Sequence, residues 1–155
     1  MLVAAHVEKF RRMEAALGRL DPEADPELWI WTAMNGLTHL MNAALHRLGL
    51  TTEVDSFHSQ VEGLWAIPDR RTGRLADAMH RPGEGDVMHL GRPPIPAPLP
   101  EPILRAGAAL KIIEDLRTPY VRGSDPVPKG ASSAWLEAYA SSRRTLLTLV
   151  ERDAR

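Results

Sequence analysis

The sequence predicts an all-α fold: a four-helix bundle of the up-down type, with a long, Pro-rich excursion between the second and third helices. Four segments repeat apolar residues at helical spacing. Prolines mark the start of two of these segments, and a glycine marks the end of one. The composition, 44% apolar and 25% charged, is that of a globular protein. At 155 residues, the chain fits one helical-bundle domain over residues 1–155.

The first two helices are predicted over residues 2–20 and 26–48. The first segment carries an apolar residue every three or four positions: Val3, Val7, Phe10, Met13, Leu17 and Leu20. Before the second, Asp25 can accept hydrogen bonds from the free N–H groups of a helix start, and Pro26 fits the first helical position. Gly49 can take the left-handed conformation that ends many helices.

The last two helices are predicted over residues 101–117 and 132–152. The third begins after Pro100, and we expect Pro119 to terminate it, because proline removes a helical N–H and clashes with the preceding turn. The fourth follows a turn-rich connection and again has helical apolar spacing, at Trp135, Tyr139, Leu146, Leu149 and Val150.

The excursion over residues 51–99 is too long for a structureless loop in a compact domain. Phe57, Val61, Leu64 and Trp65 have helical spacing and predict a short extra helix that ends before Pro68. Residues 69–92 are expected to form turns. The run PPIPAPLPEP favours polyproline II geometry, and we expect a stiff strut laid over the bundle rather than a proline-rich ligand for another domain.

Charge and cysteine content exclude several classes of function. The net charge is −1, and the arginines near residues 70–81 are interleaved with acidic residues, so there is no strong nucleic-acid signal. Without cysteine, the chain has neither disulfides nor thiol ligands, which fits a reducing compartment. The N-terminal segment lacks a long apolar core. We therefore expect a cytoplasmic protein with no membrane association.

A polar stripe on the second predicted helix is the most informative feature of the sequence. Asn35, His39, Asn42 and His46 are spaced four, three and four residues apart, which places them on one helical face. Between residues 28 and 46 there is no Asp, Glu, Lys or Arg. The stripe could be a solvent face, a buried hydrogen-bond network, or the floor of a small-molecule or catalytic site.

A metal on this stripe is not predicted. His39 and His46 are seven residues apart, about 10.5 Å along a helix, whereas helical ligand pairs normally stand three or four residues apart. The stripe has no carboxylate, so a metal would need another histidine brought in from elsewhere. The remaining histidines are His6, His58, His80 and His89. We expect no metal and no cofactor.

A second candidate segment is LRTPYVRG at the end of the third predicted helix. Arg117, Tyr120 and Arg122 could bind a phosphate or carboxylate, or the arginines could simply complement the helix dipole while Tyr120 packs. If a ligand site exists, this segment and the stripe are its candidate walls. Phosphate-loop, GxGxxG, GxSxG and HExxH motifs are absent from the sequence.

In size and helical architecture the chain resembles HEPN ribonucleases, which carry an Arg, four to six residues and then a His in a late helix. That spacing occurs here from Arg74 to His80, within the excursion, and the last predicted helix contains no histidine. No HEPN site residue is therefore carried over.

The leading functional prediction is a binding or assembly module that acts as a homodimer. Small residues at Ala33, Gly36 and Ala43 permit close helix approach, and the uncharged second helix suits burial. The alternative is a metal-independent hydrolase or ribonuclease that uses His39 or His46 with Arg117. Neither pattern identifies a substrate.

Overall fold

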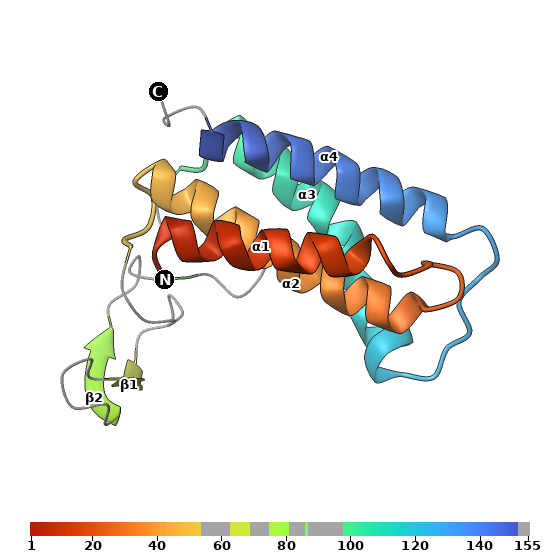
Figure 1. The fold of residues 1–155 in the computed structure, drawn as a ribbon, viewed down its shortest axis with the longest axis horizontal. Helices are drawn as coiled ribbons and strands as arrows, with labels where there is room; N and C mark the ends of the chain where they lie inside the picture. Colours follow the sequence, from red (N-terminus) through yellow and green to blue (C-terminus); the bar gives the residue numbers. More distant parts are fainter. Residues whose placement is uncertain (54–62, 69–74, 81–85, 87–97, 152–155) are drawn as a thin grey trace.

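The computed structural model describes residues 1–53, 63–68, 75–80, 86 and 98–151, in which the chain forms four main helices (Figure 1). They are α1 (Val3–Leu17), α2 (Pro26–Arg47), α3 (Glu101–Asp115) and α4 (Ser132–Glu151). The predicted all-α bundle is confirmed. The largest error in a helix end is at α1, which ends at Leu17 and not at residue 20.

Helix α2 forms the centre of the bundle. It packs against α1, α3 and α4, while α3 and α4 also pack on each other. In α2, 13 of 22 residues are buried, against 7 of 20 in α4, so its predicted central place is confirmed. Within the described part of the chain, no helix combines the length and the apolarity that crossing a membrane requires.

The α1–α2 pair places the N-terminus of the chain against the C-terminal half of α2. Figure 1 shows the two helices side by side and running in opposite directions. Gly36 lies at their contact, where a Cβ atom would stand 3.3 Å from Met13 Cβ. This close approach explains the small residue, and it brings the start of α1 within reach of the polar stripe.

The two ends of α2 differ in how well the sequence predicted them. Gly49 has φ +66°, the predicted left-handed conformation, and Leu50 N donates to Leu45 O at 3.0 Å. Asp25 stands at the helix start, but its carboxylate makes no capping hydrogen bond there. That prediction was wrong because the carboxylate is engaged in the preceding turn, where it accepts from Asp21 N at 3.4 Å.

The chain after α3 continues through Pro119 as a π-helical turn, η1 (Arg117–Arg122). Gly123 N donates to Thr118 O at 2.9 Å, a bond that spans five residues. The predicted stop at Pro119 is therefore only partly right. The α-helix does end before the proline, and the chain continues past it in a wider helical turn.

The excursion contains a β-hairpin where the sequence predicted a helix and turns. Strands β1 (Gly63–Pro68) and β2 (Leu75–His80) pair antiparallel, with Gly63 opposite His80. The short helix is therefore wrong at Leu64 and Trp65, and the predicted turns are wrong over β2. A short apolar run does not distinguish helix from strand, and here a partner strand supplies the hydrogen bonds. Phe57, Val61 and the proline run over 93–97 lie outside the described residues.

Candidate functional site

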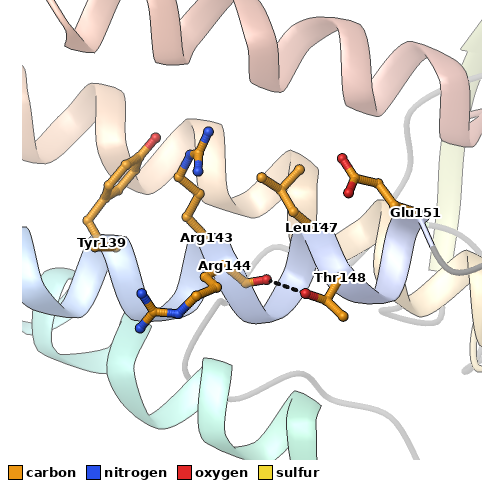
Figure 2. Close-up of a pocket in the computed structure, with 7 residues that line it drawn as sticks. Tyr139, Arg143, Arg144, Leu147, Thr148 and Glu151 are labelled. Carbon is orange, nitrogen blue, oxygen red and sulfur yellow. Dashed lines mark hydrogen bonds between the residues drawn. The ribbon is translucent and has the colours of Figure 1, made fainter.

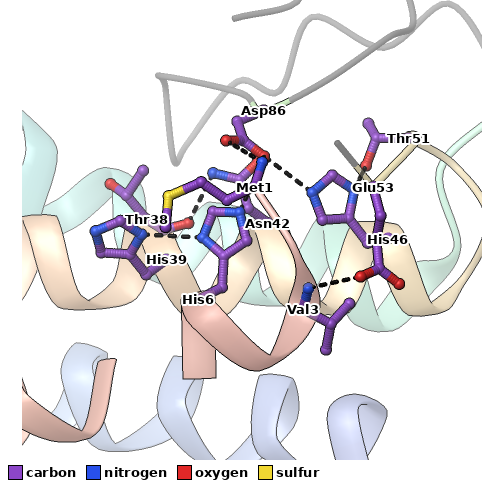
Figure 3. A network of polar contacts seen from close by, with 10 residues as sticks. All are labelled: Met1, Val3, His6, Thr38, His39, Asn42, His46, Thr51, Glu53 and Asp86. Atoms are coloured by element: carbon purple, nitrogen blue, oxygen red, sulfur yellow. Dashed lines mark hydrogen bonds and ion pairs between the residues drawn. The ribbon is translucent and has the colours of Figure 1, made fainter. Parts of the chain in front are cut away.

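Three histidines and one aspartate meet between the start of α1 and the C-terminal half of α2 (Figure 3). His6 comes from α1, His39 and His46 come from α2, and Asp86 comes from the excursion. Asp86 lies 80 residues from His6 and 40 from His46 along the chain. Three distant segments therefore contribute to one small cluster, which we call the His–Asp cluster.

The carboxylate of Asp86 is the hub of the cluster. Its Oδ1 atom lies 2.9 Å from His6 Nε2 and 2.9 Å from His46 Nε2. The Met1 amino group lies 2.8 Å from its Oδ2 atom. The side chains of His6, His46 and Asp86 are all 0% exposed. A carboxylate this deeply buried needs such partners, because a lone buried charge costs several kcal/mol.

Each of the two buried imidazoles also has a partner on its other ring nitrogen. His46 Nδ1 lies 2.6 Å from Thr51 Oγ1, and His6 Nδ1 lies 2.9 Å from His39 Nδ1. One side of each ring therefore faces Asp86, while the opposite side is held by a separate group. This arrangement fixes the orientation of both rings.

The cluster favours a charged carboxylate beside the neutral imidazoles of His6 and His39. Burial by itself would raise the pKa of Asp86, but hydrogen bonds from His46, His6 and the amino group hold it well below its ordinary value. Burial lowers the pKa of His6, against the opposing effect of Asp86. Burial, with His6 nearby, lowers the pKa of His39 to about 4. His6 and His39 are therefore neutral near pH 7, so each ring has one N–H group and one nitrogen that carries a lone pair.

The predicted stripe divides into two kinds of residue. Its histidines, His39 and His46, join the cluster. Its amides bond to the backbone of their own helix: Asn35 Nδ2 donates to Trp31 O at 2.7 Å, and Asn42 Nδ2 donates to Thr38 O at 3.0 Å. Asn42 and His46 are buried, so the stripe is not a solvent face. In its buried part, His46 takes partners from outside α2, as the hydrogen-bond alternative predicted, whereas the bond from Asn42 Nδ2 stays within α2.

The second predicted segment lies elsewhere. Arg117 stands over the Trp31 ring, 5.8 Å from its centroid, and Trp31 precedes His39 by eight residues, about 12 Å along the helix. Tyr120 packs against Trp135, with ring centroids 6.0 Å apart. Arg122 ends the same π-helical turn. The structure therefore does not bring these groups together with the histidines as two walls of one site.

A groove along α4 is a weaker candidate for a ligand site. It has a volume of about 440 Å³ and is lined by residues of that one helix, including Tyr139, Arg143 and Arg144 (Figure 2). Arg143 already pairs with Glu14 of α1, and the backbone oxygen of Arg144 accepts a hydrogen bond from Thr148 Oγ1 at 2.9 Å. This groove lacks the convergent, buried polar groups that distinguish the His–Asp cluster.

Sequence reasoning found half of the cluster. The polar stripe identified His39 and His46. The sequence contains four further histidines, and the prediction gave no reason to prefer His6 among them. The α1–α2 hairpin offered such a reason: pairing the two helices about their connection puts residue 6 opposite about residue 37. For Asp86 we find no local signal, because it lies in the excursion and reaches the bundle only through long-range contacts.

Three side chains of the cluster carry atoms that could serve as metal ligands. His6 Nε2, His46 Nε2 and a carboxylate oxygen of Asp86 all lie within 4.8 Å of one another. Around a tetrahedral zinc ion, with bonds of roughly 2.0–2.1 Å, ligand atoms stand about 3.3 Å apart. The 2.9 Å contacts to Asp86 would therefore have to open by a few tenths of an ångström, and the two histidine nitrogens, which lie within 4.8 Å of each other, would have to approach by as much as about 1.5 Å. The seven-residue spacing still rules out His39 and His46 as a ligand pair, but His6 and Asp86 supply the missing ligands.

Comparisons with protein-family models, curated proteins and solved structures found no match for this chain. No activity is therefore transferred to it by similarity. The functional argument depends on the chemistry of the His–Asp cluster.

Proposed function

We propose that this chain is a metal-binding protein whose helical bundle holds one divalent transition-metal ion between His6, His46 and Asp86. The observation that carries the proposal is the convergence of two buried imidazoles and one buried carboxylate, each imidazole being held at its other nitrogen. Histidines that bind metals almost always donate their second N–H to such an outer partner, which orients the ring.

The ligand set favours a particular class of metal. Two imidazole nitrogens with one carboxylate oxygen suit Zn²⁺, Fe²⁺, Co²⁺ or Ni²⁺, whereas Mg²⁺ and Ca²⁺ prefer oxygen ligands. Three protein ligands match the number found at catalytic zinc sites, where water or substrate completes the coordination. We therefore expect tight binding of zinc or cobalt and weak binding of magnesium.

A purely structural network is the second candidate, and a specific observation favours it. Asp86 already accepts hydrogen bonds from both histidines and faces an amino group, so its charge is compensated without a metal. In that role the cluster would only fasten the excursion to α1 and α2. Metal titration separates the two candidates.

The test is calorimetric titration of tag-free, chelator-treated protein with Zn²⁺, together with the visible absorption spectrum after addition of Co²⁺. We expect one ion per chain and a spectrum typical of mixed nitrogen and oxygen ligation. His46→Ala and Asp86→Ala should each weaken binding at least 100-fold. Asn35→Ala is the matched control, since Asn35 lies on the same helix but bonds to Trp31 O.

Two outcomes would contradict the proposal. One is the failure of the wild-type protein to bind Zn²⁺ or Co²⁺ at micromolar concentration. The other is binding that His46→Ala and Asp86→Ala leave unchanged, since the ion would then occupy some other position. Either result would leave the cluster as a structural network.

Self-association stays a separate prediction. The small residues that suggested it include Gly36, which serves the α1–α2 contact within one chain. Leu28 and Trp31, however, are 54% and 45% exposed on the first turns of α2 and offer an apolar surface. Light scattering at micromolar concentration should give about twice the chain mass, and a monomer at all concentrations would exclude the homodimer.

The metal-independent hydrolase or ribonuclease predicted as the alternative needs Arg117 beside His39 or His46. Arg117 instead lies over Trp31, nearer the start of α2. We therefore base the functional proposal on the His–Asp cluster alone.

A further inference from the structure

The contact between His6 and His39 constrains where their protons lie. The two Nδ1 atoms are 2.9 Å apart, which is hydrogen-bond distance. One proton must lie between them, because two N–H groups would repel each other, as would two bare lone pairs. The bond therefore has a direction, and that direction depends on what His6 binds at its other nitrogen.

Without a metal, the bond runs from His39 to His6. The Asp86 carboxylate can only accept, so the proton on neutral His6 is at Nε2, which donates to Asp86 at 2.9 Å. His6 Nδ1 then has a lone pair and accepts the Nδ1–H of His39. A neutral His39 has no proton left for Nε2, on the far side of its ring. Figure 3 shows that side directed away from His6 and Asp86.

With a metal, the same bond must reverse. A metal takes the lone pair of His6 Nε2, so the proton of neutral His6 moves to Nδ1. His6 then donates to His39 Nδ1, and His39 carries its own proton at Nε2. The change follows from valence alone and needs no movement of either helix.

We propose that metal binding at His6 reverses the His6–His39 hydrogen bond, so that His39 both positions His6 for the metal and reports occupancy of the site at its far nitrogen. This inference rests on the proposed metal site. The proton count is balanced. One proton leaves His6 Nε2 for water, the shared proton crosses from His39 Nδ1 to His6 Nδ1, and His39 Nε2 takes a proton from water. His39 is only partly buried, so water can supply that proton.

The second buried histidine lacks such a relay. His46 Nδ1 faces the hydroxyl of Thr51, which can donate to a bare nitrogen or accept from an N–H simply by turning its hydrogen. A change of tautomer at His46 therefore requires only that the Thr51 hydroxyl turn its hydrogen, and it affects no further group through Thr51. Of these two outer partners, His39 is the one that carries the state of the metal site to a second atom, its Nε2, which changes from a hydrogen-bond acceptor to a donor.

The test is nitrogen-15 NMR of the histidine rings, with the tautomers assigned from couplings between ring nitrogens and carbon-bound protons. Tag-free wild-type protein is measured without metal and with one equivalent of Zn²⁺, which is diamagnetic. We expect His39 to carry its proton at Nδ1 without zinc and at Nε2 with zinc. An unchanged His39 tautomer, while calorimetry shows zinc bound, would overturn this inference and leave the metal site standing.

Variants test the positioning role separately. His39→Leu cannot accept from His6, and we expect its zinc affinity to fall about 10- to 100-fold. His39→Gln offers a carbonyl oxygen as acceptor and should recover part of that loss, while Asn35→Ala should bind as the wild type does. Unchanged zinc affinity in His39→Leu would overturn the positioning role. Absence of zinc binding in the wild type would overturn the metal site as well.

Discussion

The N-terminal half of α2 is buried by aromatic rings, whereas its C-terminal half is buried around imidazoles and a carboxylate. Trp29 packs against Trp135 and Tyr139, with ring centroids 6.3 and 6.0 Å apart. His39, about three helical turns farther along, lies with His46 in the His–Asp cluster. Both halves belong to one helix that has no Asp, Glu, Lys or Arg between residues 28 and 46, so the difference lies in what the neighbouring segments supply.

The two halves respond to different requirements. An apolar contact needs area and shape, and many substitutions of similar volume satisfy it. A buried imidazole needs a specific partner atom, because an unpaired buried polar group costs roughly 1 to 3 kcal/mol. The aromatic half is therefore expected to determine stability, while the imidazole half combines stability with metal binding.

The largest expected effect comes from Met41→Asp, which places a charge in the core of the C-terminal half, between His39 and His46. Met41 is 0% exposed, and an unpaired carboxylate there should cost several kcal/mol and abolish soluble folding. Soluble yield and circular-dichroism melting measure the effect, with Met41→Leu as the control of similar volume. Wild-type melting of Met41→Asp would refute the central place of α2.

Trp29→Ala should affect the aromatic half alone. Trp29 is 2% exposed, and loss of its ring should destabilise the protein by about 3–5 kcal/mol. Urea denaturation gives this value. Zinc affinity, measured under conditions where the variant is folded, should stay within a few-fold of the wild type. A 100-fold loss of affinity would show that the two halves are not independent.

Zinc should stabilise the protein through the imidazole half. At a free concentration 100 times the Kd, a ligand specific for the folded state adds about 2.7 kcal/mol, or roughly 5–10 °C in Tm for a chain of this length. Differential scanning fluorimetry with and without a chelator measures this shift. It should vanish in His46→Ala and persist in Asn35→Ala; a shift of equal size in both variants would argue for nonspecific binding.

The smallest expected effect is that of His39→Ala in the metal-free protein. His39 bonds to His6, so its removal leaves His6 Nδ1 without that partner and should lower stability by about 1–3 kcal/mol. His39→Gln should recover part of the loss, because an amide can donate to or accept from His6. Chemical denaturation in the presence of a chelator decides this, and a His39→Ala variant as stable as the wild type would contradict the network.

The helices were predictable because their signals are local. The repeat of Val3, Phe10 and Leu17 and the Gly49 stop each lie within one segment, and the structure confirms them. The prediction was wrong at Leu64 and Trp65, where the window was too short to separate helix from strand. Local periodicity identifies a helix only when the apolar repeat extends over several helical turns.

The candidate site was only half predictable, for the same reason. His39 and His46 share a helical face, so their proximity follows from spacing alone. Asp86 reaches His46 across 40 residues, and Arg117, which seemed equally available, lies over Trp31. Which of these residues joins the cluster depends on how the excursion and the π-helical turn fold back on the bundle. Spacing along the sequence does not specify this folding.

The order of the three proposed metal ligands along the chain has a consequence for protein synthesis. His6, His46 and Asp86 all precede α3 and α4, so the proposed site is complete in sequence before the second half of the bundle exists. At 5–20 residues per second, residues 87–151 take about 3–13 s to add. During that interval a metal ion can reach ligands that the finished fold buries completely. The metal content of the mature protein would then depend on the metal supply during translation. Chains expressed in zinc-starved cells should bind zinc only slowly when it is added afterwards.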